Sequence, residues 1–236
     1  MYGLKRKNTP KRVHFERISS TQDYAREKRG EGRDLIVSAT VQTGGKGTKG
    51  RSFESQEGGV YISKLAFYQE FPAKNAFQIM AGAATAVCET LKGLGLSPVI
   101  KWPNDIFVNG KKICGILIEN VFSGANISSS IVGIGLNIHN ELSPELQEIA
   151  TTVEKETGKH FSVEEVKDSL LEALEKPVCM EKYLSYIGYI GSEAILCFGD
   201  ERIPATLLSV DEQGGLFVEI EGERKRLTST EVSVRV

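Results

Sequence analysis

The chain has 236 residues, of which 40% are hydrophobic and 25% charged, and its formal net charge is −2. These values predict one large and one small globular domain, and the near-neutral charge argues against a dedicated nucleic-acid binder. The sequence shows no apolar leader and no uninterrupted apolar run long enough to span a bilayer, so we expect a cytoplasmic protein with no membrane partner.

The cysteines and histidines do not suggest a metal centre. Cys88, Cys114, Cys179 and Cys197 are widely separated and form no C-x-x-C pair, and only three histidines accompany them. A metal cluster or a disulfide framework is therefore not indicated, and we assign these residues no chemistry.

The chain begins with a basic segment and a short predicted strand over residues 13–16. The basic residues are Lys5, Arg6, Lys7, Lys11 and Arg12. A solvated arm is the simpler interpretation, and contact with an anionic partner is the alternative. Residues Ser19-Ser20-Thr21 then predict an N-cap for a helix over 22–28.

Residues 42–51, Gln-Thr-Gly-Gly-Lys-Gly-Thr-Lys-Gly-Arg, form a loop between strands predicted over 35–41 and 60–67. Its glycines let backbone N–H groups close on a phosphate, and Lys46, Lys49 and Arg51 supply countercharge. A mobile surface turn is the alternative. Part of the loop matches G-x-G-x-x-G, but a strand follows where a dinucleotide or Walker motif needs a helix, so neither motif is indicated.

The middle of the chain predicts a long helix followed by strands. Residues 76–94 are rich in alanine, carry apolar residues on one face and end near two glycines, which predicts a helix packed on the sheet. Asn109-Gly110 is a strong hairpin signal, because both turn residues tolerate positive φ. The predicted strands here are 99–101, 106–108, 113–119 and 127–138.

Helices predicted over 163–175 and 181–187 complete an α+β domain that we place at residues 1–188. After Gly188 the sequence changes to short strand-like runs separated by turn residues, which predicts a small β-barrel or sandwich over 189–236. These runs are 194–198, 202–210, 216–220, 224–228 and 232–236. Because about fifty residues are marginally stable alone, we expect this domain to dock on the larger one.

Four segments, in this order, resemble motifs of biotin protein ligases. They are the glycine-rich loop, Lys101-Trp102-Pro103-Asn104-Asp105, residues 111–119 (Lys-Lys-Ile-Cys-Gly-Ile-Leu-Ile-Glu) and residues 133–137 (Gly-Ile-Gly-Leu-Asn), with Ser20-Thr21-Gln22 ahead. The resemblance extends over the whole chain. It implies a catalytic domain related to class II aminoacyl-tRNA synthetases, with a mixed or antiparallel sheet, and an SH3-like barrel at the C-terminus. Since only twelve residues precede Val13, it implies the monofunctional type without an N-terminal DNA-binding domain, and no DNA partner.

The reaction implied by this resemblance has two steps. Biotin and ATP give biotinyl-5′-AMP and pyrophosphate, and the adenylate then acylates a lysine of a biotin carboxyl carrier domain of a carboxylase. Mg²⁺ would shield the departing pyrophosphate; its ligands are unknown, with Asp105 a candidate through water. The family often pairs through its sheet, so a homodimer is one expectation, with the strand over 127–138 as a candidate edge.

The resemblance also assigns site residues. Lys112 would bridge the biotin carboxylate and the α-phosphate, and Lys46 and Arg51 would share the catalytic role. The biotin pocket would comprise Ser20, Thr21, Gln22, Gln42, Gly45, Tyr61, Lys112, Gly115, Leu117, Gly133, Gly135 and Leu136. The nucleotide would contact Lys46, Gly47, Thr48, Lys49, Gly50, Arg51, Phe53, Asn104 and Asn137. Strand alternation puts Lys112 and Gly115 on opposite faces, so both can touch a ligand only if a bulge or twist intervenes near Asn109-Gly110.

Three residues depart from the family pattern. Thr48 stands where an arginine usually helps to retain the adenylate, which suggests a leakier intermediate. Gln22 replaces asparagine and Phe53 replaces tryptophan, changes that keep hydrogen bonding and stacking. Two alternative functions stay open. One is a lipoate or octanoyl ligase or transferase of the same fold, and the other is a non-catalytic sensor of biotin or of a nucleotide.

Overall fold

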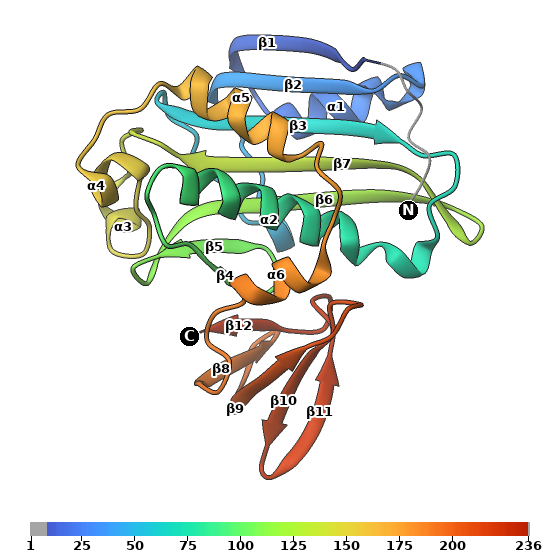
Figure 1. Cartoon of the computed structure of the whole chain (residues 1–236), viewed down its shortest axis with the longest axis vertical. Coiled ribbons are helices and arrows are strands. Elements are labelled where there is room, and N and C mark those ends of the chain that lie inside the picture. The colour runs from blue at the N-terminus through green and yellow to red at the C-terminus, as the bar shows by residue number, and fades with distance from the viewer. Residues whose placement is uncertain (1–8, 236) are drawn as a thin grey trace.

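Apolar and β-branched runs up to Asn137 form a seven-stranded sheet (Figure 1). The structure is a computed structural model that describes residues 9–235. The strands are β1 (Lys11–Ile18), β2 (Leu35–Gln42), β3 (Gly59–Phe67), β4 (Val99–Lys101), β5 (Asp105–Val108), β6 (Lys111–Ser123) and β7 (Asn126–Asn137). Their order across the sheet is β1-β2-β3-β7-β6-β5-β4. β1 and β2 run parallel and the remaining neighbours antiparallel, which confirms the predicted α+β class.

Helices cover both faces of this sheet (Figure 1). Strand alternation sends Ile62, Ile134 and Leu136 into the main core beneath α2, and Leu65 and Ile131 into a smaller cluster beneath α1. The helices are α1 (Thr21–Glu27), α2 (Phe77–Gly93), α3 (Pro144–Gln147), α4 (Val153–Thr157), α5 (Val163–Ala173) and α6 (Met180–Tyr186), with 3₁₀ turns at Lys28–Glu31, Thr48–Gly50 and Ala73–Asn75. The two faces therefore have separate cores.

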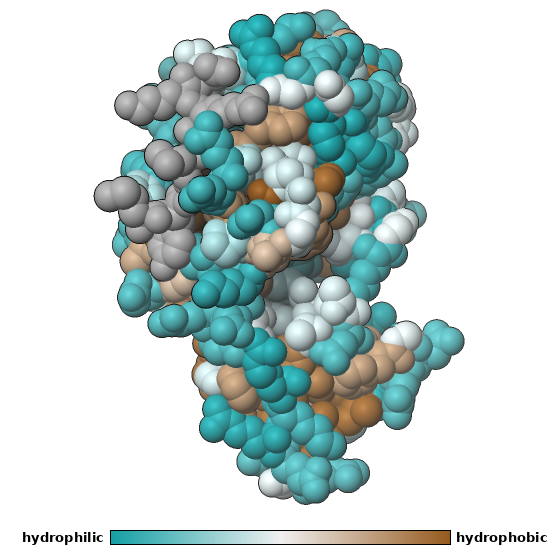
Figure 2. All heavy atoms as spheres, turned by 90° about the vertical axis from the view of Figure 1, so that its right-hand side faces the viewer, coloured by the Kyte–Doolittle hydropathy of each residue, from teal (hydrophilic) through white to brown (hydrophobic). Residues whose placement is uncertain are grey.

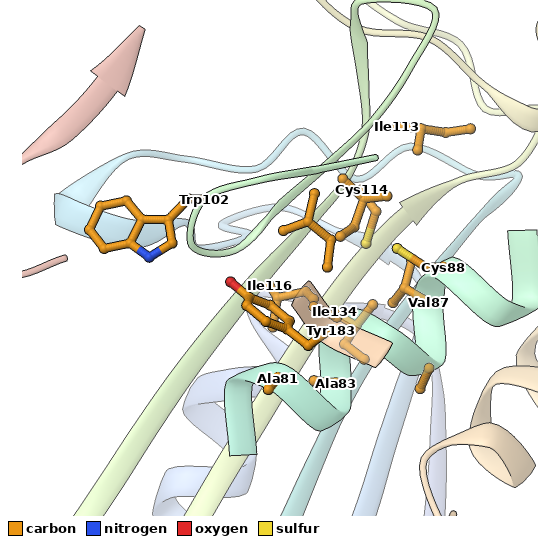
Figure 3. Packing of buried hydrophobic residues seen from close by; sticks show 14 of the residues in the cluster. Ala81, Ala83, Val87, Cys88, Trp102, Ile113, Cys114, Ile116, Ile134 and Tyr183 are labelled. Carbon is orange, nitrogen blue, oxygen red and sulfur yellow. The ribbon is translucent and has the colours of Figure 1, made fainter. Parts of the chain in front are cut away.

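Two local signals act as predicted. The Ser20 hydroxyl accepts a hydrogen bond from the backbone N–H of Asp23 at 3.3 Å and caps α1. Asn109 and Gly110 turn the β5–β6 hairpin with φ of 49° and 78°. The alanine-rich α2 brings its small side chains, such as Ala81 and Ala83, close to the sheet (Figure 3).

Two short helices, α3 and α4, lie in a region for which no element was predicted. Pro144 is at the start of α3, where its missing N–H costs nothing. α4 is capped by the Thr152 side chain, which accepts from Lys155 N at 3.2 Å, and ends at Gly158 in the left-handed region. Each signal is present in the sequence, but the helices are too short to show an apolar period.

The end of the chain forms a second, five-stranded antiparallel sheet in the order β11-β10-β9-β8-β12, which we call the C-terminal sheet. Its strands are β8 (Glu193–Phe198), β9 (Glu201–Val210), β10 (Leu216–Ile220), β11 (Glu223–Leu227) and β12 (Ser233–Arg235). Its buried residues continue the core beneath α2. Figure 2 shows hydrophobic residues gathered over this sheet, below a waist in the molecular surface. The domain boundary at residue 188 stays a prediction; it falls between α6 and β8.

One expectation about the sheet is wrong. The strand over 127–138 was a candidate edge, but β7 is hydrogen-bonded to β3 on one side and β6 on the other, and the outer strands are β1 and β4. Two predictions concern residues that the structure does not describe. Lys5, Arg6 and Lys7 belong to the predicted basic arm, and Val236 to the last predicted strand. Within residues 9–235, no helix is long and apolar enough to cross a membrane.

The core beneath α2 gives a direct test of the fold. Leu91 is fully buried there, so Leu91→Ala should lower the free energy of unfolding by about 3 kcal/mol, through lost burial and the cavity left behind. Urea denaturation followed by circular dichroism measures this. Lys92→Ala on the exposed side of the same helix is the control, and equal losses in the two variants would contradict the assigned packing.

Candidate active site

A cavity of about 610 Å³ opens on the face of the large sheet that carries α1. Its walls come from the start of α1, the glycine-rich loop, the central strands and the segment after β7. The structure brings together here most of the residues expected in the site: Ser20, Thr21, Gln22, Gln42, Lys46, Gly47, Thr48, Arg51, Phe53, Asn104, Lys112, Gly115, Leu117, Gly133, Gly135 and Asn137.

The floor of the cavity consists of glycine backbone in β6 and β7. A Cβ on Gly133 would lie 2.5 Å from Gln22 Oε1, and one on Gly135 would lie 2.5 Å from Phe53 Cε1. A Cβ on Gly115 would lie 3.2 Å from both Lys112 and Phe53. Contacts under 3.0 Å do not fit a real Cβ, so the Phe53 ring lies as it does only because residue 135 is a glycine, and a Cβ on Gly133 would displace the end of the Gln22 side chain.

Lys112 and Gly115 both line the cavity because the β5–β6 pairing shifts between them. Phe107 pairs with Lys112, whereas the adjacent Ile106 pairs with Cys114, which leaves Ile113 as an extra residue on β6. Such a bulge changes the face on which following side chains lie. The bulge required for Lys112 and Gly115 to lie on the same face is therefore present.

A hydrogen-bonded group of polar side chains forms one end of the cavity. Gln42 Oε1 accepts from the backbone N–H of Thr21 at 2.8 Å, and Gln42 Nε2 donates to Ser55 Oγ at 2.9 Å. Ser63 Oγ donates to Gln22 Oε1 at 3.0 Å and lies 2.9 Å from Thr21 Oγ1. Thr21, Gln22 and Ser63 are buried, so this group offers fixed donors and acceptors in a partly apolar site.

The outer side of this group is held by ion pairs. Gln22 Nε2 donates to Glu119 Oε1 at 3.2 Å, and Arg26 Nε donates to Glu119 Oε2 at 2.9 Å. The hydrogen bonds from Arg26, and to a smaller extent that from Gln22, hold the pKa of Glu119 below its usual value against the opposing effect of burial. Glu119 therefore stays ionised and fixes the orientation of the Gln22 amide.

Cations dominate the other end of the cavity. Its lining includes Lys46, Lys101, Lys112, Arg51 and Arg235 against the carboxylates of Glu54, Asp105 and Glu148. Lys112 Nζ lies 2.7 Å from Asp105 Oδ1, although Asp105 Oδ1 has no hydrogen-bond partner of good geometry, so the contact is an ion pair with poor alignment. This excess of positive charge suits a polyanion.

Two cations of the glycine-rich loop are held by neighbouring groups. Lys46 Nζ donates to Asp23 Oδ1 at 2.7 Å. Burial alone would raise the pKa of Asp23, but the hydrogen bonds from Lys46 and Arg26 lower it overall. Arg51 Nη2 donates to Thr48 Oγ1 at 2.8 Å, so Thr48 orients the arginine that lines the cavity.

Lys101 is electrostatically the most perturbed cation of the cavity. Burial lowers its pKa, and the charges of Lys112, Arg51 and Arg235 lower it further, while Asp105 works in the opposite direction. Burial and the neighbouring cations thus disfavour the charged form of Lys101, and an anion in the cavity would favour it.

Five expected residues do not line the cavity. Leu136 lies between Gly135 and Asn137 on β7, so alternation points it into the core beneath α2. Tyr61 is buried beyond the cavity, where its hydroxyl donates to Gln56 O at 2.6 Å. The loop residues Gly45, Lys49 and Gly50 are also outside the lining. Gly45 packs instead against Phe53 O and Ser55 Oγ, and Lys49 is exposed in a left-handed turn.

Several lining residues were not expected. Ser63 is a polar residue in an apolar strand, a signal that could have identified it. Lys101 begins the motif of residues 101–105 but was given no role. Arg235 reaches the cavity from the end of the C-terminal sheet, and no local pattern could place it there.

Residues 142–150 form an apolar flap beside the cationic end. Leu142, Leu146 and Ile149 line the cavity, and Ile149 is 62% exposed. Backbone hydrogen bonds join the flap to β6, because Lys112 N donates to Ile149 O and Thr151 N donates to Lys112 O, each at 2.9 Å. The flap is therefore fixed to the Lys112 backbone and adds apolar surface to the cavity lining.

Residues 14–137, more than half of the chain, match the family described as the Biotin/lipoate A/B protein ligase family. The chain belongs to this family. The matched segment includes the glycine floor, the polar group and four of the five cations. The flap and Arg235 lie beyond it, so this ligase completes its cavity with residues outside the family match.

Relatives and solved structures agree with this assignment. The ligase is 30% identical over 244 residues to the bifunctional ligase/repressor BirA of Bacillus subtilis, covering 94% of this chain and 73% of that protein. It is 28% identical over 215 residues to the biotin--[acetyl-CoA-carboxylase] ligase of Paracoccus denitrificans, with 83% and 88% covered. The biotin protein ligase from Aquifex aeolicus in complex with biotin and ATP has a TM-score of 0.78 and 31% identity, over 95% of this chain and 98% of that one.

Proposed function

We propose that this member of the family is an ATP-dependent biotin protein ligase. It forms biotinyl-5′-AMP from biotin and ATP and transfers the biotinyl group to a lysine of a biotin carboxyl carrier domain. One observation carries the proposal: a single cavity joins a hydrogen-bonding, glycine-floored end to a cationic end, and Lys112 lies against the floor at Gly115. The Aquifex aeolicus structure in complex with biotin and ATP supports this choice of ligands.

The polar end suits the biotin ring and the glycine floor suits its tail. A ureido group needs both donors and acceptors, which Thr21, Gln42 and Ser63 supply from fixed positions. Gly133 and Gly135 carry no Cβ, so an apolar tail could approach the backbone closely once the Phe53 ring and the Gln22 amide above them move aside.

Adenylation requires two anions to meet. An oxygen of the biotin carboxylate attacks the α-phosphorus of ATP, and pyrophosphate leaves with the bonding electron pair. Lys112 would neutralise charge on both reacting groups, and Arg51, Lys46 and Lys101 would hold the phosphates in line. In the second step the carrier amine attacks the acyl carbonyl, AMP leaves, and the amide forms with loss of a proton from the amine.

Magnesium fits this site only as a companion of the nucleotide. Within residues 9–235, no group of three or more His, Cys, Asp and Glu side chains could hold a metal ion. Mg²⁺ bound to phosphates and water needs one or two carboxylates, and Glu54, Asp105 and Glu148 line the cavity separately. When bound, it would shield the charge of the departing pyrophosphate.

The proposal also covers the cellular location of the protein and its partners. The four cysteines are free thiols, which suits a reducing cytoplasmic location. The carrier domain is the expected protein partner. Homodimer formation and the finer likeness to class II aminoacyl-tRNA synthetase and SH3-like folds stay predictions.

Lys112 gives the decisive test of catalysis. Lys112→Ala should lower biotin-dependent pyrophosphate release from Mg-ATP by about 10²–10³-fold, because the charge that stabilises the transition state is lost. The measurement uses purified protein with hydroxylamine to trap the acyl-adenylate. Lys111→Ala is the matched control, because the neighbouring Lys111 lies outside the cavity lining and its ammonium donates to Gln147 O.

The same assay separates the alternatives. Equal losses in the Lys111 and Lys112 variants would remove Lys112 from the mechanism. Faster turnover with octanoate or lipoate than with biotin would indicate a lipoate or octanoyl ligase. Binding of biotin without turnover of any acid would indicate a sensor.

The depressed pKa of Lys101 predicts a proton linkage to nucleotide binding. Phosphates beside Lys101 should raise its pKa, so ATP binding takes up protons at alkaline pH and weakens as pH rises through the Lys101 pKa of the free protein. Isothermal titration calorimetry in two buffers of different ionisation enthalpy counts these protons. Lys101→Arg keeps the positive charge, but arginine does not titrate in this pH range, so this variant should take up fewer protons when ATP binds. An unchanged number of protons would refute the role of Lys101.

Thr48 predicts weak retention of the adenylate. In Thr48→Arg a cation replaces a hydroxyl beside Arg51, and biotinyl-5′-AMP should leave about tenfold more slowly, the effect of one charge-assisted hydrogen bond. A chase of enzyme loaded with labelled biotin measures the release. Thr48→Met adds length without charge and also removes the hydroxyl that accepts from Arg51, so it should release the adenylate at least as fast as the native protein. Equal rates in all three proteins would contradict the prediction.

A further inference from the structure

The C-terminal sheet is joined to the large sheet by a buried hydrogen bond as well as by the chain. Trp102, which is 6% exposed, donates from Nε1 to the carbonyl oxygen of Gly214 at 3.0 Å. Gly214 belongs to the turn between β9 and β10 and has a φ of +80°. A Cβ built on it would lie 2.2 Å from Phe77 Cδ2, so the turn rests directly on the Phe77 ring.

These contacts close into a circuit that we call the clasp, comprising Trp102, Gly214, Phe77, Tyr183 and Pro103. The rings of Phe77 and Tyr183 meet edge to face, with centroids 5.3 Å apart at 85°. The Tyr183 hydroxyl then donates to Pro103 O at 3.1 Å, next to Trp102 in the chain. Figure 3 shows Tyr183 among the core side chains near Ile116 and Ile134, and Trp102 apart from them on the side of the pale red ribbon of the C-terminal sheet.

The turn that carries Gly214 is itself rigid. Asp211 Oδ1 accepts from the backbone N–H groups of Gln213 and Gly215 at 2.9 and 2.8 Å, and Asp211 Oδ2 accepts from Arg226 Nε at 2.7 Å. Gly214 N also donates to Asp211 O at 2.9 Å. The Gly214 carbonyl therefore has a fixed direction before it meets the indole.

The clasp joins the two segments that bring cations to the cavity. Lys101 and Asn104, on either side of Trp102 in the chain, line the cavity, and Arg235 of the C-terminal sheet also lines it. The apolar core shared by the two sheets holds them together, and burial of apolar surface is not itself directional. A hydrogen bond is directional, so it can set the angle at which Arg235 enters.

We propose that Trp102 is a positioning residue, whose indole N–H fixes the C-terminal sheet so that Arg235 acts on the nucleotide. The inference rests on the proposed function, since it names what holds one nucleotide-facing cation in place. Trp102 itself does not line the cavity. Its loss should therefore affect ATP and leave biotin unchanged.

The kinetic test removes only the donor. Trp102→Phe keeps an aromatic ring but leaves the buried Gly214 carbonyl without a partner, and should raise KM for ATP about tenfold with little change in kcat. Biotin affinity, measured by calorimetry without nucleotide, should stay the same. In an Arg235→Met background the same substitution should have a much smaller effect on KM, because the cation that it positions is gone.

A second test uses the turn and needs no catalysis. Trp102 is the only tryptophan of the chain, so its fluorescence reports the clasp. Gly214→Ala should shift its emission to longer wavelength and increase its quenching by acrylamide, because the added Cβ collides with Phe77. Gly222→Ala is the matched control: Gly222 also has a φ of +80°, in the β10–β11 turn, but has no atom within 4 Å of the added Cβ.

The outcomes distinguish this inference from the proposed function. Three results would each overturn the positioning role. They are additive effects of Trp102→Phe and Arg235→Met on KM for ATP, a loss of biotin affinity in Trp102→Phe as large as its loss for ATP, and equal fluorescence spectra for Gly214→Ala and Gly222→Ala. If the native protein does not turn over biotin, the proposed function fails, and the fluorescence comparison together with direct ATP binding still tests the clasp.

Discussion

The site depends on a stretch of sheet that has side chains on only one face. On β6 and β7, Ile116, Ile134 and Leu136 fill the core beneath α2, and this packing holds the two strands in place. The opposite face carries Gly115, Gly133 and Gly135 and is left to the cavity. Because the core on one face supplies the stability, the other face can carry glycines, over which only the Gln22 amide, the Lys112 side chain and the Phe53 ring lie, without loss of the sheet. Every group that lines the cavity is placed relative to this floor.

The charges of the cavity are arranged for a ligand that is itself anionic. Lys112 is held by Asp105 and Lys46 by Asp23, so each keeps a defined position through one carboxylate. Burial lowers the pKa of Lys101, and the charges of the neighbouring Lys112, Arg51 and Arg235 lower it further. A site that balanced all its cations with carboxylates would have to break those pairs on binding. Here part of the positive charge is uncompensated, so binding a polyphosphate relieves repulsion among cations.

Most of the fold could be predicted, because its elements have local signals: the Ser20 cap, the Asn109-Gly110 turn and the apolar runs of the strands. The glycine motifs contain Gly115, Gly133 and Gly135, which line the cavity. One expected residue lies elsewhere because of register. Leu136 was assigned to the pocket with Gly135, although alternate residues of a strand face opposite sides. Arg235 could not be found, because its approach to the cavity depends on how two sheets pack, and that packing has no sequence period.

The packing of the two sheets makes the C-terminal sheet part of the site. The motif over residues 101–105 supplies Lys101 and Asn104 to the cavity, while Trp102 between them faces the other way, into the core. One short segment thus contacts both the nucleotide end of the cavity and the turn at Gly214. A movement of the C-terminal sheet would be transmitted to these residues through a single backbone turn. The cavity and the junction between the sheets therefore form one mechanical unit, although they belong to regions of sequence more than a hundred residues apart.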